Sequence, residues 1–288
     1  MKHVGSGAMK GTMRGIAVSL MLVGASVVVT ACQSDPDIDI TKLGVETDPP
    51  DVLYKQALAN MNKGNMTEAS RKFEAIDKQY PFTEWGQKAL VMQTFIATRT
   101  NKNDVAITTG SRFLRQYPRS KDAAYVQYMI GLAYSKQISD VTQDQRAAQR
   151  TVEAMNKVVN DYPDSEYVAD AQAKIRFARD QLAGREMQVG RYYLERKEYL
   201  AAVSRFRIVV EQYQNTNQIE EALARLTEAY YAMGLVDEAQ TAAAVLGNNY
   251  PDSQWYADSY KLLKGQGLEP RENKGSWISR AGKKLIGA

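Results

Sequence analysis

From Leu53 onward, apolar side chains recur at the spacing of one helix face, and few stretches show the alternation typical of a strand. The helical pattern is interrupted at intervals by Tyr-Pro, or once by Tyr-Gln. The interrupting tyrosines are Tyr80, Tyr117, Tyr162, Tyr213 and Tyr250. Because proline cannot continue a helix and disfavours helix in the residue before it, each pair marks the end of a helical unit. The pattern predicts five such units in series.

The residues inside each unit match a helix-turn-helix repeat. The five tyrosines lie 37, 45, 51 and 37 residues apart, near the roughly 34-residue period of tetratricopeptide repeats with insertions. These repeats have small residues where their two helices cross and an aromatic residue in the second helix. The fourth unit has Gly190, Ala202 and Phe206 in that register, whereas the second has Gly110 where the aromatic belongs. We therefore predict an all-α tetratricopeptide-repeat solenoid of about five helix-turn-helix units with a C-terminal capping helix.

Two stretches depart from the repeat pattern. The third unit has an extra loop around Ser139–Gln145, and residues 165–183 form an additional helix that leads into the fourth unit. This helix either continues into residues 186–196 or breaks near Gly184. Residues Asp252–Lys264 are expected to form the capping helix.

The C-terminal tail, residues 275–288, has a basic amphipathic pattern. On a helix, Trp277, Ile278, Ala281 and Leu285 would share one face, with most of the basic side chains elsewhere. Such a segment is typical of a contact with a membrane surface or a partner groove. A frayed chain end is the alternative, because two glycines lie inside a short stretch.

The first 32 residues have the pattern of a bacterial lipoprotein precursor. A basic start is followed by an apolar stretch, residues 16–29, which is shorter than the ~20 apolar residues of a transmembrane helix and has the length of a signal-peptide core. It ends in Val-Thr-Ala-Cys, which resembles a lipobox. Residues 1–31 are thus expected to be cleaved and Cys32 to carry the lipid; an uncleaved anchor with an incidental cysteine is the alternative. Gln33, where an aspartate would indicate inner-membrane retention, favours the outer membrane.

The location of the charge argues against a nucleic-acid partner. The chain has a net charge of +4 and a pI near 8.9. Residues 1–31 contribute +3 and residues 264–288 contribute +4, which leaves −3 for residues 32–263 between them. A nucleic-acid-binding protein normally carries its positive charge on the folded body.

Residue counts also argue against an enzyme. The single histidine is His3 and the single cysteine is Cys32, so the mature chain offers neither imidazole chemistry nor a cysteine metal site or disulfide framework. A glycine-rich phosphate loop and a domain outside the repeats are missing as well. We predict no catalytic residue, no metal and no cofactor.

Several stretches carry a resemblance to a known family. They are Gln79–Phe82, Asp161–Tyr167, the run from Asp180 through Arg196, and Asn249–Pro251. With the lipobox and the order of the units, they resemble the BamD (YfiO, ComL-like) family of lipoproteins of the outer-membrane β-barrel assembly machinery, over the mature chain to about Lys264. The resemblance implies a lipid-anchored scaffold on the periplasmic face of the outer membrane. Its implied partners are a periplasmic domain of BamA, accessory assembly lipoproteins and unfolded outer-membrane proteins.

The resemblance also implies candidate site residues. Tyr80, Arg112 and Arg115 fall in the region that receives the C-terminal segments of unfolded outer-membrane proteins. Arg205 falls where the family pairs an arginine with an acid of BamA. Guanidinium groups suit these roles because they can bind a carboxylate through two hydrogen bonds. A plain structural role stays open for each: Tyr80 also ends a repeat, and the arginines also suit a solvated helix face.

A second function is compatible with the same pattern, namely a periplasmic repeat lipoprotein that serves peptidoglycan or cell-division machinery. For either function we expect the same segments: signal peptide 1–31, lipidated tether 32–50, substrate-side repeats 51–118, partner-docking repeats and capping helix 119–264, and linker and basic amphipathic tail 265–288.

Overall fold

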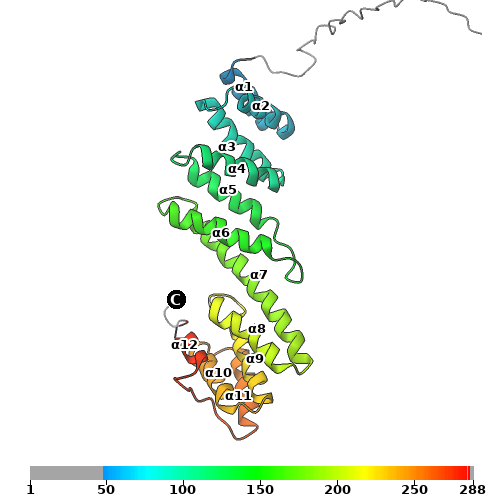
Figure 1. Ribbon diagram of the computed structural model, residues 1–288, viewed down its shortest axis with the longest axis vertical. Helices are drawn as coiled ribbons and strands as arrows, with labels where there is room; N and C mark the ends of the chain where they lie inside the picture. Colours follow the sequence, from blue (N-terminus) through cyan, green and yellow to red (C-terminus); the bar gives the residue numbers. More distant parts are fainter. Residues whose placement is uncertain (1–47, 284, 286–288) are drawn as a thin grey trace, which may run out of the picture. The chain divides into compact units, whose positions relative to one another are not determined.

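The computed structural model describes residues 48–283 and residue 285, and all regular structure within them is helical. The predicted signal peptide, Cys32 and residues 33–47 of the tether lie outside the described residues. Figure 1 shows the helices in chain order. They are α1 (Pro50–Asn62), α2 (Met66–Gln79), α3 (Glu84–Arg99), α4 (Asn103–Gln116), α5 (Ala123–Ser135), α6 (Arg146–Asp161), α7 (Val168–Glu195), α8 (Tyr199–Gln212), α9 (Ile219–Ala232), α10 (Val236–Asn249), α11 (Gln254–Lys264) and α12 (Trp277–Gly282).

The first ten helices form five antiparallel pairs, α1–α2 through α9–α10, and each pair packs against the next. Helix α11 packs on α9 and α10 and so covers the last pair, as expected for a capping helix. The predicted all-α repeat fold is confirmed. In the described part of the chain, no helix is both long and apolar enough to cross a membrane.

The predicted repeat-ending tyrosines have one common backbone geometry. Each is the C-cap of the second helix of its pair, with φ between −137° and −125° and ψ between 41° and 64°. Each tyrosine N–H donates to the carbonyl four residues earlier. Proline in the next position disfavours helix here, but Tyr213 has the same geometry before Gln214, so the tertiary packing also ends the helix.

Helix α7 is continuous from Val168 to Glu195. The open question of a break near Gly184 is thereby answered: the additional helix and the first helix of the fourth unit are one. The inserted loop of the third unit lies against this helix, since Val141 Cγ1 lies 3.3 Å from the position a Cβ on Gly184 would take.

Large and small side chains are matched where helices cross. A Cβ added to Gly190 of α7 would lie 2.4 Å from the buried ring of Phe206 on α8. In the second unit Gly110 on α4 lies where the fourth unit has Phe206, and Ile130 of α5 and Thr94 of α3 fill the space. This different packing explains why the second unit matches the sequence pattern least well.

The tail folds back on the chain's own repeats. Helix α12 packs on α10 and α8, as Figure 1 also shows. Ile278 is fully buried, and Trp277 Nε1 donates to the Tyr230 hydroxyl at 3.2 Å. The described part of the tail is therefore not frayed. Its apolar face covers the fourth and fifth units and does not face a membrane or a partner; residues 284 and 286–288 lie outside the described residues.

Candidate binding surfaces

Tyr80 lies in a tight connection between the first two units. Its ring is half-buried and packs against the apolar cluster of the first unit. The Thr83 hydroxyl donates to the Tyr80 carbonyl at 2.7 Å and accepts from the Gly86 N–H at 3.1 Å. A Cβ on Gly86 would lie 2.5 Å from the Tyr80 carbonyl oxygen, so this connection needs glycine there. Tyr80 thus has a packing role.

Phe82, in the same connection, was not predicted as a site residue. Its side chain is 76% exposed and its φ is +62°. A bulky side chain in the left-handed region is uncommon, and strain of this kind gathers at functional sites. The sequence signal that could have found it is its own position, directly after the repeat-ending Tyr-Pro.

Arg112 and Arg115 share helix α4 but face different neighbours. The Arg112 guanidinium forms an ion pair with Asp77 of α2, across the first two units. Arg115 instead lines a cavity of about 430 Å³ whose walls come from α4, α5 and α6. We call this cavity the open groove. Besides Arg115 it is lined by Tyr134, Arg150, Glu153, Lys157 and Asp161, among others. The structure therefore does not bring the two predicted arginines together.

Arg205 on α8 contacts an acid of its own chain. Its Nη1 lies 3.2 Å from Glu186 Oε2 on α7. The Arg205 side chain is 41% exposed, so this pair is only partly screened from water. A guanidinium has five N–H donors in a planar fork, and Glu186 uses one of them. The remaining donors stay available to a second acceptor.

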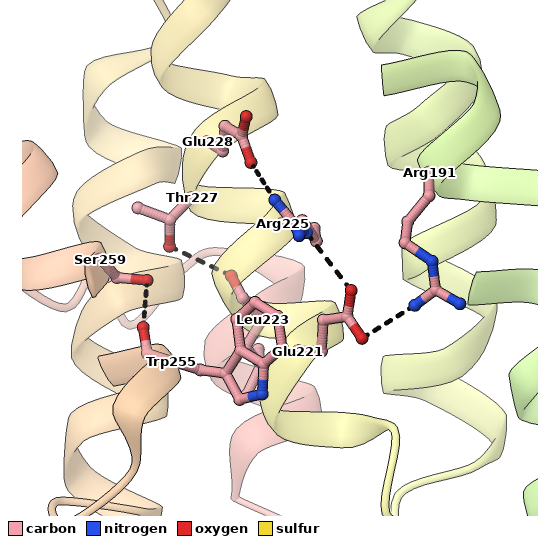
Figure 2. Close-up of polar contacts among 8 residues, drawn as sticks. All are labelled: Arg191, Glu221, Leu223, Arg225, Thr227, Glu228, Trp255 and Ser259. Atoms are coloured by element: carbon pink, nitrogen blue, oxygen red, sulfur yellow. Dashed lines mark hydrogen bonds and ion pairs between the residues drawn. The ribbon is translucent and has the colours of Figure 1, made fainter. Parts of the chain in front are cut away.

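A chain of ion pairs joins α7 to α9 (Figure 2). Glu221 on α9 accepts from Arg191 of α7 at 2.8 Å and from Arg225 of its own helix at 3.4 Å. Arg225 also donates to Glu228 at 2.9 Å. Burial disfavours the charged form of Arg225, but its hydrogen bonds to the two glutamates outweigh that effect and raise the pKa of the guanidinium.

The same arginine contacts the capping helix. The Arg225 guanidinium lies 5.2 Å from the ring centre of Trp255 on α11, within the range of a cation–π contact. The two residues, with Glu228 and Asp258, line a cavity of about 290 Å³ between α9 and α11. Sequence reasoning missed this network, because its members come from three helices and no single stretch displays them.

No group of three or more residues in the described part of the chain is arranged to hold a metal ion. The surfaces described above consist of ion pairs and exposed apolar side chains.

Residues 46–246 match the profile of YfiO, a family of outer membrane lipoproteins. The chain belongs to the YfiO family. This match reaches all five units of the solenoid but ends inside α10, before the capping helix and the tail.

Curated relatives match a larger part of the chain than the family profile does. The chain is 38% identical to the outer membrane protein assembly factor BamD of Caulobacter vibrioides, over 88% of this chain and 82% of that protein. It is 34% identical to the BamD of Rickettsia prowazekii, over 85% of this chain and 95% of that protein. The BamD of Neisseria meningitidis serogroup A is 28% identical over 84% of this chain and 94% of that protein.

Among solved structures, a thermophilic tetratricopeptide-repeat protein of Thermus thermophilus is 17% identical. It aligns over 73% of this chain and 98% of that chain with a TM-score of 0.34. That score is too low to support a statement about the fold, which rests on the helix pairs themselves.

Proposed function

We propose that this chain is a lipid-anchored periplasmic scaffold of the outer-membrane protein assembly machinery. A role in outer-membrane protein assembly follows from the curated relatives that carry that name, at up to 38% identity over most of both chains. This match is the observation that carries the proposal. The repeat architecture supports it, because stacked helix pairs present extended surfaces for partners and no catalytic constellation is apparent in the described residues.

The C-terminal units are proposed to dock the periplasmic domain of BamA, with Arg205 as one contact. The free donors of its guanidinium support this role. Glu186 would hold the side chain in place while an acid of the partner binds the other edge of the fork. The accessory assembly lipoproteins are proposed to dock on the same units.

The N-terminal units are proposed to receive the C-terminal segments of unfolded outer-membrane proteins through Tyr80, Arg112 and Arg115. The exposed ring of Phe82 beside Tyr80 supplies apolar area for such a segment. Because Arg112 and Arg115 face different neighbours, a bound segment would cross α4 and contact the two arginines in turn. Lipidation of Cys32 would hold these surfaces at the inner face of the outer membrane.

The test is affinity recovery of the tagged lipoprotein from detergent-solubilised outer membrane. We expect a large barrel protein with periplasmic repeats to be recovered with it. Arg205→Ala should lower that recovery, while Glu186→Gln, which removes only the charge of the intrachain partner, should preserve it. Recovery of peptidoglycan or cell-division factors alone would contradict the proposal.

A loss of recovery with both variants would show that the Arg205–Glu186 pair matters for the local structure and that Arg205 does not contact a partner directly. Circular dichroism of the purified variants supplies the control for folding. Both side chains are partly exposed, so their helical signal should equal that of the wild type.

A further inference from the structure

The groove that the tail helix fills and the open groove lie at equivalent positions in two different repeats. Helix α12 lies across α8 and α10, and its Trp277 contacts Tyr230 of α9 between them. We call the surface that it covers the tail groove, made by α8, α9 and α10. The open groove is made by α4, α5 and α6, the same three helices two units earlier. One groove of this type is thus filled by a helix, whereas no helix of the described residues fills the other.

The correspondence holds residue by residue when positions are counted from the repeat-ending tyrosines. Arg115 and Glu211 both lie two residues before their tyrosine, and Lys157 and Val245 both lie five residues before theirs. Tyr134 and Tyr230 both lie 17 residues after the preceding repeat-ending tyrosine. In the tail groove Tyr230 accepts a hydrogen bond from Trp277; Tyr134 lines the open groove.

Burial shows that the open groove lacks the helix that its counterpart has. On α10, Thr241 is fully buried and Val245 is 3% exposed, because the segment that leads into α12 covers Thr241 and α12 itself covers Val245. A Cβ on Gly282 of α12 would lie 2.6 Å from Val245 Cγ1. At the matching positions of α6, Glu153 and Lys157 are both exposed. The described residues thus leave the outer face of α6 without a helix on it.

The charges of the two grooves are opposite. Beside α12 and its N-cap Ser276 the tail groove has one cation and two acids, a net charge of −1: Arg207, Glu211 and Glu238. It holds a basic segment, whose exposed residues include Arg280 and Lys283. The open groove has three cations and two acids, a net charge of +1: Arg115, Arg150, Lys157, Glu153 and Asp161.

Two of the open groove's cations are available to a ligand. Arg150 pairs with Glu153 at 3.0 Å. Arg115 and Lys157, by contrast, form no ion pair or hydrogen bond with another described residue. Side chains of like charge on facing helices attract a counter-charge, and complementary charge selects the partner of a groove.

We propose that the open groove binds an acidic amphipathic helix of a partner protein. The helical form of the ligand follows from the way α12 fills the matching groove, and its acidic character follows from the reversed charges. An aromatic residue of the ligand takes the place of Trp277 beside Tyr134, and its acids face Arg115 and Lys157. This inference goes beyond the proposed function and does not depend on it; only Arg115 is common to both.

The test uses the intact lipoprotein in detergent and a labelled peptide. The peptide has the sequence of residues 273–283 with Lys274, Arg280 and Lys283 replaced by glutamate. Fluorescence anisotropy should show that it binds the wild-type chain. Binding should weaken at least tenfold in Arg150→Glu/Lys157→Glu. The unaltered basic peptide should bind that variant better than it binds the wild type.

A matched control carries the same change of charge elsewhere. Arg176 on α7 and Lys261 on α11 are exposed and line neither groove, so Arg176→Glu/Lys261→Glu should leave the affinity for the acidic peptide unchanged. The milder pair Arg150→Gln/Lys157→Gln gives the same comparison with less charge perturbation if the first variant folds poorly. The proposal is overturned if the wild type does not bind the acidic peptide, or if the control weakens binding as much.

A photo-cross-linker at Lys157 in living cells identifies the occupant. We expect cross-links to an acidic, amphipathic helical segment of another protein. Cross-links to residues 33–47 of the same chain would assign the groove to the acidic tether, and cross-links to a second copy would assign it to self-association. Either result, or no cross-link at all, would overturn the proposal. Loss of peptide binding with unchanged recovery of the barrel partner would leave the proposed function intact.

Discussion

The crossing of α7 and α8 allows a quantitative test of the packing. In Gly190→Ala the new methyl group would lie 2.4 to 2.8 Å from three atoms of the Phe206 ring, whereas carbon atoms in favourable contact are ~3.5–4.0 Å apart. The ring is fully buried and cannot turn into solvent, so the two helices must separate. Overpacking of this kind costs about 1–3 kcal/mol.

Gly184→Ala in the same helix is the matched control. Its methyl group would meet only Val141 Cγ1, at 3.3 Å, on the inserted loop. Both variants gain about 1 kcal/mol from the helix propensity of alanine, so this contribution cancels in their difference. Gly190→Ala should therefore be about 1–3 kcal/mol less stable than Gly184→Ala. For a domain of this size that corresponds to a melting temperature lower by about 2–12 °C.

Thermal unfolding followed by circular dichroism measures the difference. Phe206→Leu should relieve the clash, so the combined Gly190→Ala/Phe206→Leu variant should lose less stability than the two single losses added together. Equal melting temperatures for Gly190→Ala and Gly184→Ala, or strict additivity with Phe206→Leu, would refute the packing of α7 on α8.

Three further predictions concern the network, the tail and the tyrosines. Glu221→Gln removes the charge and one acceptor oxygen of the acid that Arg191 and Arg225 share, and it should cost about 1–3 kcal/mol in urea unfolding. Glu228→Gln, at a 47% exposed side chain, should cost less than about 1 kcal/mol. Trp277→Ala removes the contact with Tyr230, so trypsin should remove the tail faster, as mass spectrometry will show; an unchanged rate would contradict the docked tail. Burial, with a hydrogen bond to Glu166, raises the pKa of Tyr167 to about 12. Since the unfolded value is about 10, this residue's stabilisation is present below about pH 10 and lost towards pH 12; absorbance titration should show one late-ionising tyrosine fewer in Tyr167→Phe.

The periodic features of the fold were predictable from the sequence because they are local. Proline disfavours helix in the tyrosine before it through the sterics of neighbouring residues, so four of the five helix ends have a local signal, although packing contributes to them as well. Whether α7 would break at Gly184 was not predictable, because the answer depends on the inserted loop of another unit packing against that glycine.

The binding surfaces were less predictable than the fold. Arg112 and Arg115 have the same sequence signal, yet one pairs with Asp77 and the other lines the open groove. Which partner each meets depends on the register between helices of different units. The tail shows the same limit. Its amphipathic pattern was visible, but not the groove that it fills, since contacts such as that of the Gln214 amide with the Ala281 carbonyl join residues 67 positions apart in the chain.

The contact between Gln214 and Ala281 gives a physical reason why no proline follows Tyr213. A proline at position 214 could not supply the side-chain amide that bonds both Val210 and Ala281. The one repeat end without proline is therefore the one on which the tail docks.

Depletion of the lipoprotein from growing cells tests the central claim most directly. If the chain is a scaffold for outer-membrane protein assembly, the amount of folded barrel proteins in the outer membrane, measured by their heat-modifiable migration in gels, should fall soon after depletion. Wild-type chain should restore it, and Cys32→Ala, which cannot carry the lipid, should not. Undiminished barrel proteins after complete depletion would contradict the account.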